Sequence, residues 1–156
     1  MKMHWKKLLV CLGIPLAVGG ASALLSGGMD AYKTVVQPPL SPPGWVFPVV
    51  WTVLYLLMGY ASYRVLTSGA ATEDIKRALT FYGIQLFLNF LWSPVFFGLQ
   101  WALAAFFILV AMWVMIYLTI REFSKIDELA GDLLLPYILW VTFAGYLNLG
   151  VYLLNR

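Results

Sequence analysis

The sequence predicts an all-α integral membrane protein: one domain, residues 1–156, built as a bundle of five transmembrane helices. Two observations predict this class. The chain is 62% hydrophobic, with only 10 basic and 7 acidic side chains. A charge at mid-bilayer costs about 2.5–3.5 kcal/mol, and a helix needs about 20 apolar residues to cross the hydrocarbon core. The charges are clustered, so that four long blocks contain no Asp, Glu, Lys or Arg: Leu8–Met29, Thr34–Tyr63, Ala78–Ile120 and Leu133–Asn155.

The first span is expected at about 7–26. Lys2, Lys6 and Lys7 precede it and would also suit a cleaved signal peptide. However, the apolar run is long for a signal peptide and no convincing small-x-small cleavage site follows it, so we favour a retained helix. This helix carries small residues that let neighbouring helices approach closely: Gly13, Ala17, Gly19, Gly20, Ala21 and Ala23.

A proline-rich stretch, QPPLSPPGWVFPVVW (37–51), predicts a lid-like loop at 27–44 before the second span at 45–66. Four prolines between positions 38 and 43 fix φ and prevent helix formation, which favours a stiff extended or turned course. Pro48 is tolerated because it falls in the first helical turn. A long connection with little charge should pack on the protein, either as a lid over a site or as a linker resting on the bundle.

The second span has an aromatic face. Phe47, Trp51, Tyr55 and Met58 follow one another at i, i+4, i+8 and i+11, which is one side of a helix. Trp51 lies about 9 Å deeper than Trp45, beyond the usual interfacial belt of aromatic residues. Because its indole N–H needs a hydrogen-bond partner in hydrocarbon, Trp51 is expected to face inward.

The 43-residue block 78–120 is too long for one helix. Pro94 and the short GLQ at 98–100 divide it into a third span at 78–98 and a fourth at 101–121. The third span places polar and aromatic residues on one face: Gln85, Asn89, Trp92 and Phe96.

The fifth span, expected at 131–154, presents Trp140, Ala144, Leu147 and Asn148 on one face, with Phe143 and Tyr137 beside it. Amides at membrane depth usually face the bundle interior, because an unpaired amide in lipid costs several kcal/mol. They can bridge helices by hydrogen bonds or contact a ligand, and aromatic faces can pack together or wall a pocket. Three such helices converge beneath one stiff loop, which favours a hydrophobic cavity for a flat, largely apolar ligand.

Charge also indicates orientation. Five spans place eight basic residues on the side of the N-terminus, and only Lys33 and Arg156 on the other. The positive-inside rule then puts the N-terminus in the cytoplasm and the C-terminus outside. The eight residues are Lys2, Lys6, Lys7, Arg64, Lys76, Arg77, Arg121 and Lys125.

Several function classes are disfavoured by composition. Cys11 and His4 are the only residues of their types, so neither an internal disulfide nor a metal site held by His and Cys is expected. No paired carboxylates or nucleophile–base pair suggests hydrolysis, and no mid-membrane carboxylate suggests an ion-coupled transporter. The net charge of +3 sits at span ends and gives no nucleic-acid patch.

The motifs PPLSPPGWVFPVVWTVLYLLMGYASY, QLFLNFLWSPVFFG and LLLPYILWVTFAGYLN resemble bacterial-type members of the translocator protein family, also called the TspO/MBR, tryptophan-rich sensory protein or peripheral benzodiazepine receptor family. The resemblance implies a five-helix membrane bundle, commonly dimeric. It also implies binding of porphyrins such as protoporphyrin IX, of benzodiazepine-type drugs and, in animals, of cholesterol. No resident cofactor is implied.

The resemblance further implies a pocket between spans 1, 2, 3 and 5 under the first loop, in a sensor, regulator or carrier of tetrapyrroles. As an alternative, it implies an enzyme that degrades protoporphyrin IX with light and oxygen, with Trp51 and Trp140 as redox or positioning residues. A purely structural membrane protein is the third interpretation. The implied ligand-binding residues are Tyr32, Pro42, Trp51, Asn89, Phe90, Trp92, Trp140, Phe143, Ala144 and Leu147.

Two features bear on the partners. Where many members have Lys-Pro in the first loop, this chain has Gln37-Pro38, which removes a cation that could meet a porphyrin propionate, and Lys33 could substitute. Leu149–Arg156 fits a loose sterol-contact pattern through Tyr152, although such short patterns match often by chance. The expected partners are therefore a porphyrin or other apolar small molecule, membrane lipid including a sterol, and a second copy of the chain.

Overall fold

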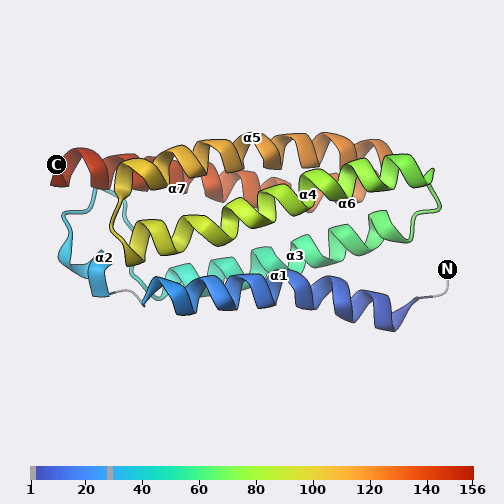
Figure 1. Ribbon diagram of the computed structural model, residues 1–156, viewed down its shortest axis with the longest axis horizontal. Helices are drawn as coiled ribbons and strands as arrows, with labels where there is room; N and C mark the ends of the chain where they lie inside the picture. Colours follow the sequence, from blue (N-terminus) through green and yellow to red (C-terminus); the bar gives the residue numbers. More distant parts are fainter. Residues whose placement is uncertain (1–2, 28–29) are drawn as a thin grey trace.

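The structure, a computed structural model, describes residues 3–27 and 30–156, and at residues 30 and 31 the backbone alone. Lys2, counted above in the charge bias, and positions 28 and 29 of the expected loop lie outside the described residues. Within the described part all regular structure is helical, and five segments are long and apolar enough to cross a membrane (Figure 1). The predicted class, an all-α membrane bundle of five spans, is confirmed.

The helical elements follow in chain order. They are α1 (Trp5–Ser26), α2 (Asp30–Thr34), α3 (Val46–Leu66), α4 (Thr72–Ser93), the π-helical turn η1 (Pro94–Gly98), α5 (Ala102–Ile126), α6 (Glu128–Asp132) and α7 (Leu135–Asn155). α4 with η1 forms one span, and α6 with α7 forms another. The two chain ends lie at opposite ends of the bundle, with α2 near the C-terminus (Figure 1). We call these the N-terminal end and the C-terminal end.

Two helices extend further than the charge-free blocks suggest. α4 begins at Thr72 rather than 78, and α5 continues to Ile126 rather than 121. A charged side chain marks where a span leaves the hydrocarbon, but the helix can continue in water. Glu73 and Asp74 even favour the start of α4, because carboxylates in a first turn interact well with the helix dipole.

The loop and the Pro94 region also differ in detail from expectation. The short helix α2 precedes the prolines, whereas the proline segment itself is not helical. The chain stays helical through Pro94 as the π-helical turn η1, in which the Leu99 N–H donates to the Pro94 carbonyl at 2.9 Å. The chain reverses only after η1, where Gln100 adopts a φ of 56°.

The packing order of the spans decides where a cavity can form. α1 lies along α3 and α4, α4 packs along α5, and α5 packs along α7 (Figure 1). α1 and α3 touch backbone to backbone at Gly59, where an added Cβ would lie 2.6 Å from the Cys11 carbonyl oxygen and 2.7 Å from the Leu12 Cα. A small residue is therefore required there.

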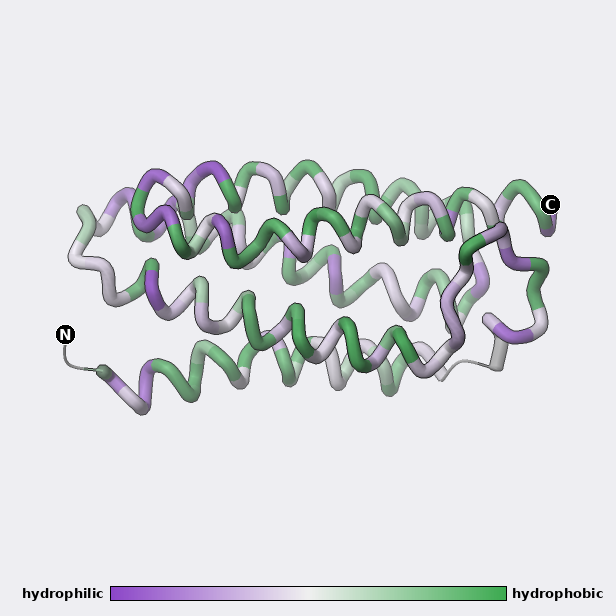
Figure 2. The backbone as a smooth tube through the Cα atoms, turned by 180° about the vertical axis from the view of Figure 1, so that it is seen from behind, coloured by the Kyte–Doolittle hydropathy of each residue, from purple (hydrophilic) through white to green (hydrophobic). Residues whose placement is uncertain are grey.

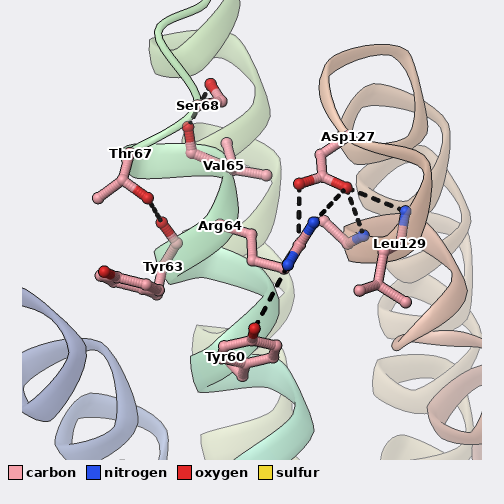
Figure 3. Close-up of polar contacts among 9 residues, drawn as sticks. Tyr60, Tyr63, Arg64, Val65, Thr67, Ser68, Asp127 and Leu129 are labelled. Carbon is pink, nitrogen blue, oxygen red and sulfur yellow. Dashed lines mark hydrogen bonds and ion pairs between the residues drawn. The ribbon is translucent and has the colours of Figure 1, made fainter. Parts of the chain in front are cut away.

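Polar residues gather mostly toward the ends of the bundle, and the middle is hydrophobic (Figure 2). At the N-terminal end the Arg64 guanidinium donates to both Asp127 carboxylate oxygens, at 2.9 and 3.4 Å, and to the Tyr60 hydroxyl at 3.3 Å. The same carboxylate caps α6 by accepting from the Leu129 N–H at 3.0 Å (Figure 3). This cluster joins α3 to the α5–α6 junction.

Candidate ligand-binding cavity

A chain of buried hydrogen bonds ties three spans together at mid-bundle. The Tyr55 hydroxyl donates to the Asn89 Oδ1 (2.8 Å), the Asn89 Nδ2 donates to the Tyr137 hydroxyl (2.7 Å), and Tyr137 donates to the Gln85 Oε1 (2.6 Å). All four side chains are buried. These amides therefore bridge helices, which is one of the two roles expected for them, and they fix the position of the Tyr55 ring.

A second bridge fixes Trp92. Its indole N–H donates to the Asn148 Oδ1 at 2.9 Å, and the Asn148 Nδ2 donates to the Ala102 carbonyl at 2.7 Å. Because each polar atom in this bridge has a partner, the Trp92 ring is held in one orientation between α4 and α7.

A cavity of about 320 Å³ lies beside this network, between α1, α3 and the α4–η1 span. One wall is aromatic, whereas the α1 wall consists mainly of small residues. The lining residues are Leu16, Gly19, Gly20, Ser22, Ala23 and Ser26 of α1; Phe47, Pro48, Trp51, Thr52 and Tyr55 of α3; and Asn89, Trp92, Ser93 and Phe97 of α4–η1.

The aromatic wall is a continuous set of ring contacts. Trp51 stacks on Tyr55 with centroids 5.6 Å apart and an interplanar angle of 26°, and it lies 6.4 Å from Trp92. On the opposite side the backbone of Gly19 lies so close to the Tyr55 ring that a Cβ would collide with it. The cavity can thus receive a flat group against rings, next to a helix that offers little side-chain bulk.

A polar patch lies within the α1 and α4 walls. The Ser22 hydroxyl donates to the Phe90 carbonyl at 2.9 Å, the Ser26 hydroxyl donates to the Ser22 carbonyl at 2.7 Å, and the Ser26 and Ser93 oxygens are 2.7 Å apart. With Ser26 donating to Ser22, the proton between the other two hydroxyls comes from Ser93. All three hydroxyl protons are then used inside the protein, so the patch offers acceptor lone pairs to an N–H or O–H group.

Trp140 lies behind the aromatic wall and does not line this cavity. Its ring meets Trp51 edge to face at 6.5 Å and Phe47 at 5.9 Å. The expectation of one hollow shared by both indoles is therefore wrong for this structure, because the two rings fill the space between them. On its other side Trp140 borders an open groove of about 540 Å³ between α3 and α7. Its indole N–H is buried and has no partner among the described residues.

The remaining α7 residues of the predicted site also stand behind the wall. Ala144 and Leu147 are buried in the core, and Phe143 packs on Trp140 at 5.6 Å and lines the groove. The expectation that the fifth span walls the cavity is thus not met. Helical periodicity correctly gives the buried face of α7, but that face is covered by the α3 and α4 aromatics.

Tyr32 closes the C-terminal end of the cavity. Its ring packs edge-on against Phe47 (5.2 Å) and Phe97 (5.9 Å), two cavity-lining residues, and its hydroxyl donates to the Pro42 carbonyl at 3.3 Å. The Gln37 amide donates to the Tyr32 carbonyl at 2.7 Å. Burial raises the pKa of the Tyr32 hydroxyl above its ordinary value, so this group stays a neutral donor.

The proline segment is fastened to the end of α7. The Val36 backbone exchanges two hydrogen bonds with the Asn155 amide, at 2.9 and 2.8 Å, and the Tyr146 hydroxyl donates to the Pro39 carbonyl at 2.6 Å. Buried Pro38 lies where a Cβ on Gly150 would be. The loop therefore rests on α7, while Tyr32 covers the cavity.

A further cavity of about 400 Å³ lies at the C-terminal end, between the loop, the α4–α5 turn and the last turn of α7. Tyr152 and Arg156 of the sterol-contact pattern are in its wall, as is Trp101. It lacks the stacked aromatic rings of the α1–α3–α4 cavity, which is the stronger candidate for a flat ligand.

Sequence reasoning placed Trp51, Asn89 and Trp92 correctly beside the cavity but missed the α1 wall. Gly19, Ser22 and Ser26 were taken as part of a packing surface. The available signal was the spacing of Ser22 and Ser26, one helical turn apart in an otherwise apolar span, since a hydroxyl in hydrocarbon needs a partner.

Comparison with known proteins gives a consistent result. The sequence profile of the TspO/MBR family matches residues 11–154. A tryptophan-rich protein TspO of Chlorobaculum tepidum is 40% identical over 95% of both chains, and a tryptophan-rich sensory protein of Cereibacter sphaeroides is 39% identical over 99% of this chain and 95% of that one. A translocator protein of Bos taurus is 35% identical over 83% of this chain and 77% of its own length.

Proposed function

Because the chain belongs to the TspO/MBR family, we propose that it binds porphyrin-type tetrapyrroles such as protoporphyrin IX, and apolar drug-like molecules, as a sensor, regulator or carrier in the membrane. One observation carries the proposal: the cavity sets the ring wall of Trp51, Tyr55 and Trp92 opposite the small residues of α1. A flat ring system would stack on the first wall and lie against the second.

The size of the cavity sets a condition on this proposal. At about 320 Å³ it lies at the lower end of ligand pockets, which span about 300–1,000 Å³. A drug-sized aromatic ligand would fit with small side-chain shifts. A tetrapyrrole macrocycle would require α1 to move outward from Tyr55, which is plausible chemistry for a wall made of glycine, alanine and serine.

Polar groups would orient the macrocycle. The acceptor patch of Ser22, Ser26 and Ser93 suits pyrrole N–H groups or a protonated carboxyl. For an ionised propionate, Lys33 is the available cation of the first loop because its side chain is exposed. Gln37 is less suited to that role, since its amide already holds the Tyr32 carbonyl.

The residues proposed for the site then fall into two groups. Trp51, Asn89 and Trp92 would touch the ligand. The others would hold the ring wall or close the cavity from behind or from its end: Tyr32, Pro42, Phe90, Trp140, Phe143, Ala144 and Leu147. Trp140, for example, would act by supporting Trp51.

Titration of the purified protein with protoporphyrin IX in the dark, followed by tryptophan fluorescence, tests the proposal. Wild-type quenching should saturate, and Trp51→Phe should raise Kd about tenfold, which corresponds to about 1.4 kcal/mol of lost stacking. Trp45→Phe is the matched control, because Trp45 is 69% exposed and does not line the cavity. Quenching that never saturates, or equal Kd values for both variants, would refute a specific site.

The contact between Trp51 and Trp140 favours a second candidate function, oxidative breakdown of protoporphyrin IX with light and oxygen. Trp51 would lie against the substrate, and the edge-to-face neighbour at 6.5 Å could share an oxidising equivalent. Under light, loss of porphyrin absorbance with a defined product should cease in Trp140→Phe while dark binding persists. Bleaching at the rate seen in protein-free detergent would argue against catalysis.

We also propose that the N-terminal end faces the cytoplasm and that the chain forms homodimers. The described basic residues near that end outnumber those at the other, which is the pattern of cytoplasmic loops. A single cysteine introduced at Ser68, in a Cys11→Ala background, should react with an impermeant maleimide only after cells are opened. Labelling of intact cells would reverse the orientation.

A further inference from the structure

The cavity reaches the outer surface of the bundle between α1 and α3. Several of its lining residues are exposed: Gly20 and Ala23 on α1, and Pro48 and Thr52 on α3. A residue that both lines a cavity and is exposed marks its rim. Since these two helices are spans, the rim faces the hydrocarbon of the membrane rather than water.

The rim is low and apolar. An ideal Cβ on Gly20 would have no other atom within 4 Å, so α1 leaves open space at that point. The Thr52 hydroxyl is satisfied internally, because it donates to the Pro48 carbonyl at 2.7 Å. A lipid-dissolved molecule passing here would therefore break no hydrogen bond of the protein.

The route through the C-terminal end is closed by comparison. Tyr32, Phe47 and Phe97 pack pairwise edge to face across it, and each is no more than 6% exposed. The loop above them is held to α7 by the paired hydrogen bonds between Val36 and Asn155. Passage along this route would require ring displacement and the breaking of those bonds.

We propose that the ligand reaches the cavity sideways, from the hydrocarbon of the membrane, through the gap between Gly20–Ala23 of α1 and Pro48–Thr52 of α3, without movement of the loop. The proposal rests on the proposed function of the cavity. It defines the ligand class more narrowly: a flat amphiphile that partitions into lipid before it binds, with its apolar edge leading and its N–H or O–H groups directed to the serine patch.

The test narrows the gap from each side separately. Gly20→Phe and Thr52→Phe add a ring at the rim without adding a tryptophan, so tryptophan quenching by protoporphyrin IX remains the signal. In nanodiscs in the dark, stopped-flow mixing should show association and dissociation both slowed about tenfold in each variant, with Kd changed less than about threefold. A barrier on the path changes both rates together, whereas a damaged site raises Kd.

Gly13→Phe is the matched control. Gly13 lies on the same helix and is equally open, but it does not line the cavity, so its rates should equal those of wild type. Circular dichroism confirms folding of each variant, and the two rim variants stand in for one another if one misfolds.

A variant that cannot hold the loop supplies the contrasting arm. Asn155→Leu removes both hydrogen bonds to Val36, and the proposal expects its rates to stay at the wild-type value. Faster exchange in Asn155→Leu together with unchanged rates in both rim variants would overturn the lateral path and leave the cavity intact as a site. Unsaturable binding by the wild-type protein would instead overturn the proposed function.

Discussion

Removing the Tyr137 hydroxyl should measurably destabilise the bundle, because this group joins the hydrogen-bond chain at its centre. It accepts from the Asn89 amide at 2.7 Å and donates to the Gln85 carbonyl at 2.6 Å. Tyr137→Phe keeps the ring, so packing against Trp51 should persist, and only the two bonds are lost.

The magnitude follows from the membrane setting. In water-soluble cores an unsatisfied buried group costs about 1–3 kcal/mol, but hydrogen bonds between membrane helices average about 0.6 and reach about 1.7 kcal/mol, because the unfolded chain in the membrane also finds partners. Two bonds therefore predict a loss of about 1–3 kcal/mol in the free energy of unfolding.

Unfolding in mixed micelles with increasing SDS, followed by circular dichroism, measures this loss. Tyr117→Phe is the control, because Tyr117 is 47% exposed on α5 and lies outside the network. A double-mutant cycle of Tyr137→Phe with Gln85→Leu should show coupling, since each single change already breaks their shared bond. Equal stabilities of Tyr137→Phe and Tyr117→Phe, or strict additivity in the cycle, would refute the reasoning.

Two further predictions concern helix packing and the N-terminal cluster. Gly59→Ala should destabilise the protein by about 1–3 kcal/mol, because its Cβ meets the α1 backbone, whereas Gly13→Ala should be neutral or stabilising by helix propensity. SDS unfolding compares the pair, and equal effects would contradict the backbone contact. Asp127→Ala should cost about 1 kcal/mol more than Arg64→Ala, because it removes the cap of α6 as well as the ion pair. If only the ion pair matters, the two losses will be equal and both will shrink in high salt.

The spans could be predicted because membrane insertion penalises charge so strongly that charge-free blocks mark them. The helix ends could not, since Thr72–Arg77 and Arg121–Ile126 are helical segments outside the charge-free blocks. Periodicity likewise showed that Asn89 and Trp92 face inward. It could not show whether their polar atoms meet a ligand or another helix, because that depends on the distance to residues such as Tyr137 and Asn148 on a different span.

The position of the cavity needed the packing order of the helices. Trp51 and Trp140 both face inward, as their patterns predict, but inward-facing rings can either enclose a space or fill it. Here they meet, and the open space lies on the other side of Trp51, where α1 offers glycine and serine in place of large side chains. A single sequence gives the face that each helix buries, not the neighbour that covers it.

The most direct measurement is a structure of the protein with protoporphyrin IX bound in lipid nanodiscs, determined in the dark. The macrocycle should lie between α1 and the rings of Trp51 and Trp92, with its polar edge toward Ser22 and Ser26. A macrocycle seated in the groove between α3 and α7, or in the cavity at the C-terminal end, with the space beside Gly19 unfilled, would contradict this account.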